Sequence, residues 1–174
     1  MNIAKLCPRE DLGFCNCYVV GDEGSPCFVV DPGYNGNGFL HRYIEKHHQG
    51  KCLGFLLTHA HYDHIFGLVD YPGAKDIPVF INAVEAEKLS DPRLNLSGRH
   101  GVPVIELTDL SVYAFEDEDQ IKLGDTVIEV IETPFHTSGS SCFYLSKDNV
   151  CFSGDTLFHL SIGRSDLPTG SSIR

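Results

Sequence analysis

Short apolar runs separated by polar turns open the chain, and one stretch with helical spacing follows them. We expect strands at residues 1–7, 14–20 and 26–30, which are rich in cysteine, valine and aromatic side chains. In residues 38–48 the apolar side chains recur three and four positions apart, which predicts a helix. The apolar run 53–57 predicts a buried strand. Strand, helix and strand in this order indicate a crossover unit packed on a sheet.

The rest of the chain is expected to combine short helices with a second set of strands. Residues 65–71 and 83–89 predict the helices, and residues 90–110 predict an irregular rim or lid over a cleft. Gly124 and Asp125 supply a tight hairpin turn. The expected strands are 78–81, 112–115, 120–123, 126–131, 142–146 and 149–152.

Four potential metal ligands follow the run 53–57 within six positions: His59, His61, Asp63 and His64. Imidazole and carboxylate groups bind zinc at about 2.0–2.2 Å. If the loop is still extended at His59 and His61, their spacing of two points both imidazoles to the same side. Asp63 and His64 are adjacent and would face different directions, as if toward a second metal. The alternative is a polar turn rich in histidine, but so tight a cluster favours a metal centre.

Two further strand exits carry one potential ligand each. His136 lies in the loop after one predicted strand, and Asp155 lies just past another. Loops at strand ends commonly build one site in layered α/β folds, so these residues are expected to join the cluster at His59. Asp31, at a third strand end, has two open interpretations. Its carboxylate could support a ligating imidazole, or it could belong to an Asp-Pro-Gly turn.

Composition restricts the classes of partner. The 174 residues are enough for one domain with a sizeable core. The formal net charge of −11 argues against nucleic acid or an anionic membrane as the main partner. No apolar run approaches the ~20 residues of a membrane span, and the N-terminus shows no secretory signal.

The seven cysteines are expected to be free thiols. Their number is odd and most lie inside apolar runs, which favours a reducing compartment and hence a cytoplasmic protein. Cys15 and Cys17 could form a metal or redox pair. Alternation along a strand places both on one face, however, so packing in the core is the favoured interpretation.

Four motifs together resemble those of metallo-β-lactamase-fold hydrolases, and within that superfamily they are most similar to the glyoxalase II-like (hydroxyacylglutathione hydrolase-like) proteins. The resemblance covers essentially the whole chain. The first motif is highly specific for the superfamily, and the last favours the glyoxalase II-like branch. The motifs are residues 58–67 (THAHYDHIFG), 133–140 (TPFHTSGS), 153–158 (SGDTLF) and 162–168 (IGRSDLP).

The resemblance implies an α/β (α+β) protein with a four-layer αβ/βα sandwich and metals at one edge between two sheets. Zinc is the expected metal, in two sites. Glyoxalase II-like members also use iron or manganese, which the same ligands can bind. The implied ligands are His59, His61 and His136 for the first metal, Asp63 and His64 for the second, and Asp155 as a bridge between both.

Two departures from the family pattern modify this expectation. Phe135 replaces the usual glycine before the third histidine, and its bulk could alter that loop or narrow the substrate channel. The family also continues beyond the position of Arg174 to a Gly-His-Gly-Pro-like segment, whose histidine completes the second metal site. His159 is the one downstream candidate, but it lies close to Asp155 in sequence. We therefore expect residues 1–174 to form a single metallo-β-lactamase-like domain, C-terminally truncated relative to the family, with an incomplete second half.

The implied activity is metal-dependent hydrolysis, in which a metal-bound hydroxide attacks an acyl carbonyl and Asp63 orients that hydroxide. The expected substrate is a small-molecule thioester of the S-lactoylglutathione type. Arg164 could contact an anionic substrate or form a structural salt bridge. Two other functions remain open: a mononuclear-iron persulfide dioxygenase, and a truncated metal-binding protein without catalytic activity. The sequence leaves the natural acyl group and the oligomeric state undetermined.

Overall fold

The computed structural model describes residues 1–7, 13–99 and 101–170. Six strands form a mixed sheet in the order β1-β2-β3-β4-β5-β6. The first three strands pair antiparallel, and β3 to β6 pair parallel. The strands are β1 (Ile3–Leu6), β2 (Cys17–Val20), β3 (Cys27–Val30), β4 (Cys52–Leu56), β5 (Pro78–Asn82) and β6 (Ser111–Phe115).

A second sheet of four strands is antiparallel throughout, in the order β10-β9-β8-β7. A two-stranded hairpin, which the sequence did not predict, follows it. The predicted strands of both sheets are confirmed, with small differences at their ends. The bounds are β7 (Gln120–Leu123), β8 (Thr126–Glu132), β9 (Ser141–Leu145) and β10 (Val150–Phe152), and in the hairpin β11 (Leu157–Phe158) and β12 (Ser161–Ile162).

Helices are short, apart from α1 (Phe39–His48), which the helical spacing predicted. The helix expected at 65–71 begins earlier, as α2 (Tyr62–Ile65), and continues into the 3₁₀ turn η3 (Phe66–Leu68). No helix in the described ranges is long and apolar enough to cross a membrane. The remaining 3₁₀ turns are η2 (Gly36–Gly38), η4 (Ala74–Asp76) and η5 (Ala86–Ser90).

The prediction of a helix at 83–89 is wrong, because only the 3₁₀ turn η5 forms in this part of the described chain. The side-chain oxygen of Asn82 accepts a hydrogen bond from the backbone nitrogen of Val84 at 2.9 Å. That bond is of the kind that caps the start of a helix, so it does not oppose one. The backbone instead closes hydrogen bonds three residues apart, from Glu85 to Asn82 at 2.9 Å and from Lys88 to Glu85 at 3.0 Å, which are the bonds of a 3₁₀ turn.

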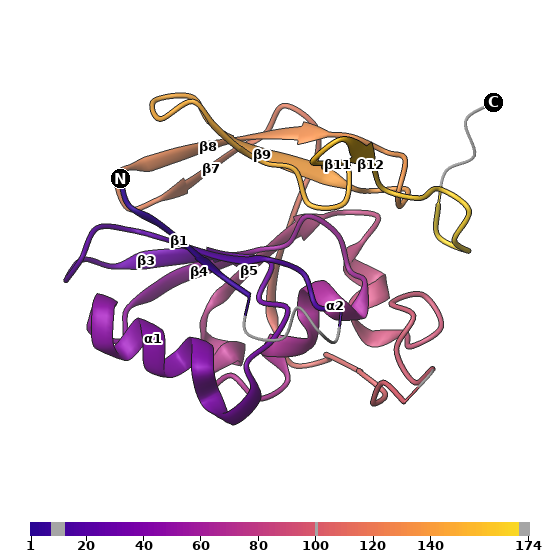
Figure 1. Cartoon of the computed structure of the whole chain (residues 1–174), viewed down its shortest axis with the longest axis horizontal. Helices are drawn as coiled ribbons and strands as arrows, with labels where there is room; N and C mark the ends of the chain where they lie inside the picture. Colours follow the sequence, from indigo (N-terminus) through magenta and orange to yellow (C-terminus); the bar gives the residue numbers. More distant parts are fainter. Residues whose placement is uncertain (8–12, 100, 171–174) are drawn as a thin grey trace.

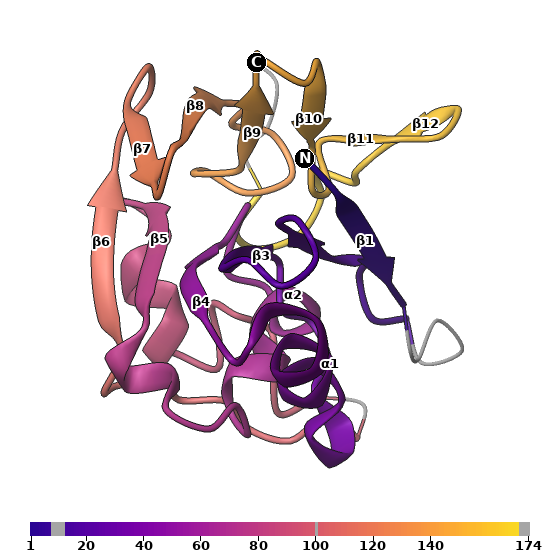
Figure 2. The ribbon, with the colours of Figure 1, turned by 90° about the vertical axis from the view of Figure 1, so that its left-hand side faces the viewer.

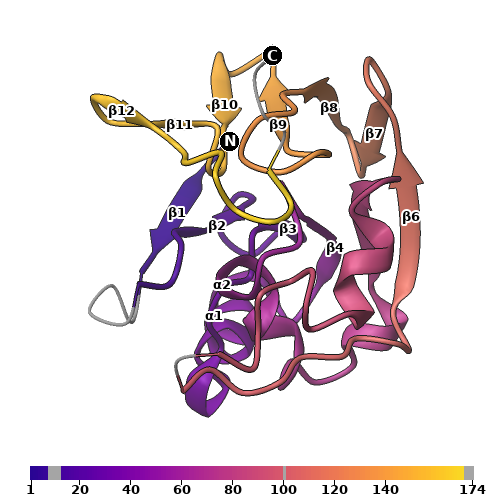
Figure 3. The ribbon, with the colours of Figure 1, turned by 90° about the vertical axis from the view of Figure 1, so that its right-hand side faces the viewer.

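The two sheets are stacked, and helices α1 and α2 lie on the outer face of the six-stranded sheet (Figure 1). Views from the two sides show the four-stranded sheet packed over the other face (Figure 2; Figure 3). The described residues thus supply three layers of the expected sandwich. Among them, no helix covers the outer face of the four-stranded sheet.

Alternation along the central strands builds two hydrophobic cores. In β3, Cys27 and Val29 pack with the helices, whereas Phe28 and Val30 pack against the second sheet. Both faces of this strand are buried, which is why its sequence is a continuous apolar run. The cores hold the two sheets in a fixed relation, and the loops at the carboxyl ends of β4, β8 and β10 meet at one edge.

The cysteines are free thiols, as predicted. Cys17 belongs to the core beneath the helices, which confirms packing as its role. Cys15 instead lies outside the strand, with its thiol 3.7 Å from the backbone oxygen of Asp31. Burial raises the pKa of Cys15 to about 11. Cys151, on β10, is exposed, so the expectation of buried thiols does not hold there.

Candidate metal centre

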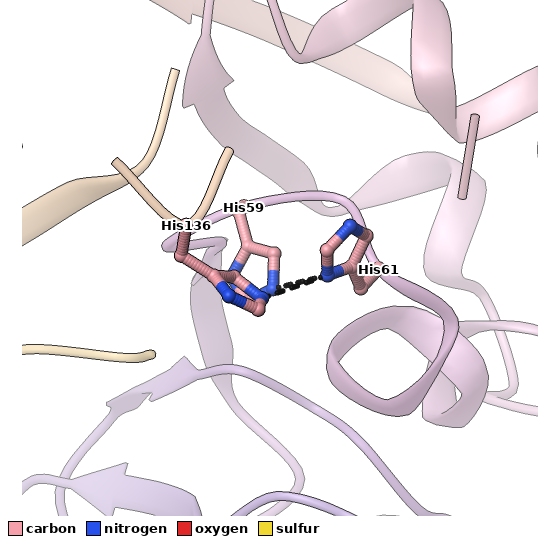
Figure 4. A group of neighbouring side chains, drawn as sticks. All are labelled: His59, His61 and His136. Atoms are coloured by element: carbon pink, nitrogen blue, oxygen red, sulfur yellow. Dashed lines mark hydrogen bonds between the residues drawn. The ribbon is translucent and has the colours of Figure 1, made fainter. Parts of the chain in front are cut away.

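Three imidazoles from two distant parts of the chain meet at this edge. Nε2 of His59 lies 3.1 Å from Nδ1 of His61, and that Nδ1 lies 2.9 Å from Nε2 of His136 (Figure 4). All three side chains are buried. Their inward nitrogens lie within 4.8 Å of one another, so the group could hold a metal ion.

The first two imidazoles share a side because the chain stays extended beyond the end of β4. His61 has φ −66° and ψ 149°, and α2 begins directly after it. Ala60, between the two histidines, points the other way and packs in the core beneath the helices. The alternation predicted from the sequence is therefore the arrangement that the structure adopts.

A hydrogen bond at the outer nitrogen orients each imidazole. Nδ1 of His59 lies 3.2 Å from the hydroxyl of the preceding threonine, and Nε2 of His61 lies 2.9 Å from the hydroxyl of Thr169. Nδ1 of His136 donates to the backbone oxygen of Arg164 at 2.7 Å. Donation from these outer nitrogens leaves the inward lone pairs available to a cation.

Burial also favours the neutral form of the imidazoles. Burial and the neighbouring imidazoles lower the pKa of His59 well below its ordinary value, and they lower the pKa of His61 to about 3. A metal binds the neutral imidazole, because the protonated ring has no free lone pair. These two side chains are therefore ready to bind a metal at neutral pH.

Asp155 lies between the three imidazoles and His64. One carboxylate oxygen is 3.4 Å from Nε2 of His136, and the other is 3.2 Å from Nε2 of His64. Ligating atoms of His59, His64 and Asp155 form a second group within 4.8 Å of one another. Burial opposes ionisation of Asp155, but the neighbouring His64 outweighs it, and the net pKa of the carboxyl is lowered. The carboxylate therefore lies between the group of three imidazoles and His64.

His64 is buried among three carboxylates. Its Nδ1 lies 3.0 Å from Asp31, and its Nε2 lies 3.6 Å from Asp63 as well as close to Asp155. Neither nitrogen makes a hydrogen bond of acceptable geometry. Burial would lower the pKa of His64, but Cys15 and these carboxylates raise it well above its ordinary value. Without a metal these carboxylates favour the protonated ring, so a divalent cation at this position would take the place of that proton and of its positive charge.

Asp63 lies at the margin of the cluster. Its carboxylate approaches His64, but it belongs to neither group of closely spaced ligating atoms in the described residues. Its side chain is 22% exposed, and burial raises the pKa of the carboxyl. The side chain also lines the cavity above the imidazoles, where it can reach a bound molecule.

Asp31 supports both groups of ligands and also forms the expected turn, so both of its interpretations hold. Its carboxylate accepts hydrogen bonds from the backbone nitrogen and the hydroxyl of Thr58, each at 2.8 Å. The same hydroxyl contacts His59, and the carboxylate contacts His64 directly. Asp31 also forms the expected turn, with φ +50°, a conformation that aspartate tolerates better than most residues.

Replacing Gly67 by alanine is expected to destabilise the protein by about 1–3 kcal/mol and to weaken metal binding. A Cβ at Gly67 would lie 2.2 Å from the backbone oxygen of Pro32, which now accepts a hydrogen bond from Gly67 at 2.7 Å. The turn that carries Asp31 would have to move. Urea unfolding and a zinc titration check this, and an unchanged unfolding midpoint would contradict it.

Two residues that orient the site were missed by the sequence reasoning. Thr169 contacts His61 from 108 positions away, and Glu85, which is fully buried, contacts the loops of His61 and His136. A charged residue in a run of moderate hydrophobicity carried no signal of burial. His159, the downstream candidate, lies on the β11–β12 hairpin and belongs to neither group of ligating atoms.

A cavity of about 420 Å³ opens above the imidazoles. A larger cavity of about 580 Å³ contains none of the candidate ligands. Two arginines, Arg99 and Arg164, lie in the wall of the first cavity beside leucine, valine and proline side chains. Phe135 does not line this cavity and instead faces a separate apolar hollow, so it does not narrow the channel as expected.

Comparison with known proteins identifies the family of this chain. The family described as "Metallo-beta-lactamase superfamily" matches residues 11–173. Relatives include the probable metallo-hydrolase YqgX of Bacillus subtilis, 35% identical over 88% of this chain and 71% of that protein. Hydroxyacylglutathione hydrolase GloC of Haemophilus influenzae is 28% identical over 91% of this chain and 77% of that protein.

Solved structures agree with this assignment. The B3 metallo-β-lactamase BLEG-1 has 33% identity and a TM-score of 0.81, over 97% of this chain and 79% of that chain. The di-iron-bound form of TTHA1623 has 28% identity and a TM-score of 0.76, over 98% of this chain and 79% of that chain. The overall fold thus has counterparts in experimental structures.

Proposed function

Because the chain belongs to the metallo-β-lactamase superfamily, we propose that it is a metal-dependent hydrolase that cleaves a thioester of the S-lactoylglutathione type. One observation carries the proposal: the inward nitrogens of His59, His61 and His136 converge beside the carboxylate of Asp155. We assign these four residues to a first metal. Asp63 and His64 would hold a second, which Asp155 would share.

A bound divalent metal supplies a Lewis acid and a water of lowered pKa. The protein's own part is to position the reactants. Asp63 faces the cavity and can accept a hydrogen bond from the attacking water, which directs its lone pair toward the acyl carbon. No serine or cysteine nucleophile is needed. The apolar part of the cavity wall limits the access of other water to the reacting group.

The cavity wall favours a substrate that carries negative charge. The side chain of Arg99 makes no ion pair or hydrogen bond with another described residue, whereas Arg164 is held by Asp166 at 2.6 and 2.7 Å. The guanidinium of Arg99 is thus available to a carboxylate on the substrate. The protein as a whole carries a charge of −11, so this local positive charge would be needed to attract an anionic thioester.

Replacing Arg99 by glutamine is expected to raise KM for an anionic thioester roughly tenfold and to leave kcat nearly unchanged, because a binding contact is lost. A neutral thioester of the same acyl group should show no change. Steady-state kinetics with both substrates check this, with Arg93→Gln as the control, since Arg93 is exposed and paired with Asp91. Equal effects on both substrates would contradict the role of Arg99.

The proposed function is tested by metal analysis together with a thioester panel. Protein loaded with zinc, iron or manganese should hydrolyse thioesters, and chelation should abolish the activity. One iron per chain together with oxygen consumption would instead indicate a persulfide dioxygenase. Bound metal without turnover of any thioester would indicate a metal-binding protein without this activity. The metal itself is open, because imidazole and carboxylate ligands suit all three ions.

A further inference from the structure

One buried carboxylate connects the two loops that carry the three imidazoles. Glu85 is fully buried and lies between β5 and η5, away from the sequence motifs. One of its oxygens accepts a hydrogen bond from the backbone nitrogen of Ala60 at 3.2 Å. The other accepts from the hydroxyl of Thr137 at 2.7 Å and from the backbone nitrogen of Gly139 at 3.0 Å.

These donors stand directly beside the candidate ligands. Ala60 separates the first two histidines of the cluster, and Thr137 follows the third. Each oxygen of the Glu85 carboxylate therefore accepts hydrogen bonds from a different one of these two loops. Gly139 allows the close approach, since a Cβ there would lie 2.8 Å from the side chain of Glu85. The carboxylate spans the gap between loops that are 75 positions apart at His61 and His136.

The charge of Glu85 is balanced locally. Lys88, itself buried, forms an ion pair with Glu85 and donates to the hydroxyl of Ser138 at 3.0 Å. A buried carboxylate is costly unless it is paired and its oxygens are satisfied. Here both conditions are met, and the lysine also contacts the loop after His136. The ion pair thus joins the two loops through hydrogen bonds. These specify the separation of the loops more closely than apolar packing would.

We infer that Glu85 is a positioning residue for the metal centre: its carboxylate sets the separation between the His59–His61 loop and the His136 loop. The ligand atoms it brings together are less than 4.8 Å apart, so a small displacement of either loop would spoil their convergence. The inference rests on the metal centre that the proposed function also requires, and not on the identity of the substrate.

The sharpest test removes one hydroxyl and keeps the charges. Thr137→Val deletes the hydroxyl that donates to Glu85 and that also lies 2.9 Å from Oγ of Ser140 in the same loop, whereas Thr137→Ser retains it. Titration of the metal-free protein with Co²⁺, followed by visible absorption, should show about a tenfold weaker affinity and an altered spectrum for the valine variant. The serine variant should resemble the natural protein. Thr108→Val, at an exposed position remote from the site, is the matched control.

Thermal melting of the metal-free variants separates positioning from general stability. If Thr137→Val lowers the melting temperature but leaves Co²⁺ affinity and spectrum unchanged, the threonine only stabilises the fold and the inference is wrong. If natural protein binds no Co²⁺, both this inference and the proposed function fail. If the natural protein and the valine variant bind Co²⁺ with equal affinity, only the inference is overturned.

A second variant addresses Glu85 itself. Glu85→Gln combined with Lys88→Met removes both charges, so that no buried charge is left unpaired. A glutamine amide accepts hydrogen bonds at only one of its two ends, so the link to Ala60 or to the other loop is lost. Co²⁺ affinity should fall at least as far as in Thr137→Val. Affinity equal to that of the natural protein would contradict the inference.

Discussion

Replacing His136 by alanine is expected to abolish tight metal binding at the first site and to lower thioester hydrolysis on the order of 10³-fold or more. In the group of three imidazoles found among the described residues, His136 is the one that comes from outside the His59–His61 segment, and it also faces Asp155. Without it the first site would lose one of its three imidazoles. Metal content by mass spectrometry and kcat/KM with a thioester measure the effect.

The control for this variant is His47→Ala. His47 lies on α1, with its ring 3.0 Å from an exposed glutamate, and contacts none of the candidate ligands. Its replacement should leave metal content and kcat/KM unchanged. If His136→Ala retains full metal content and activity, the assignment of the first site fails, whatever happens to the control.

Replacing Asp31 by asparagine is expected to weaken metal binding by about 10- to 100-fold, although Asp31 is not itself a candidate ligand. The amide keeps the size of the carboxylate but has only one acceptor end. It cannot accept from the backbone nitrogen of Thr58 at one end and also present an oxygen to the Thr58 hydroxyl and His64 at the other. The free energy of unfolding should also fall by about 1–3 kcal/mol, because a buried polar group loses its partner.

Competition of the metal-loaded protein against a chelator gives the affinity, and urea unfolding of the metal-free protein gives the stability. Asp70→Asn, at an exposed position, is the matched control and should change neither quantity. A change in stability without any change in metal affinity would show that Asp31 forms only a turn. The support that it gives to both groups of ligands would then be disproved.

Local patterns in the sequence were sufficient to predict most of the strands and the positions of the candidate ligands. The spacing of His59 and His61 predicted a shared side because the chain runs extended out of β4, and the structure keeps that conformation. The helical spacing of apolar side chains in residues 38–48 predicted α1 for a similar reason: a local period determines which face is buried.

Contacts between distant segments could not be predicted in this way. Nothing near Thr169 in the sequence shows that its hydroxyl meets His61, and nothing near Glu85 shows that two loops converge on it. The helix expected at 83–89 was wrong because the backbone there closes hydrogen bonds three residues apart, and the spacing of apolar side chains does not distinguish such a turn from an α-helix. Tertiary packing determines the contacts of Thr169 and Glu85, and a local pattern does not record it.

The central claim is that His59, His61, His136 and Asp155 surround one cation, and a crystal of the protein soaked with zinc tests it directly. An anomalous difference map recorded across the zinc absorption edge should show a peak about 2.0–2.2 Å from the inward nitrogens of the three histidines. A map with no peak among these residues, at a zinc concentration that loads the protein in solution, would contradict the account.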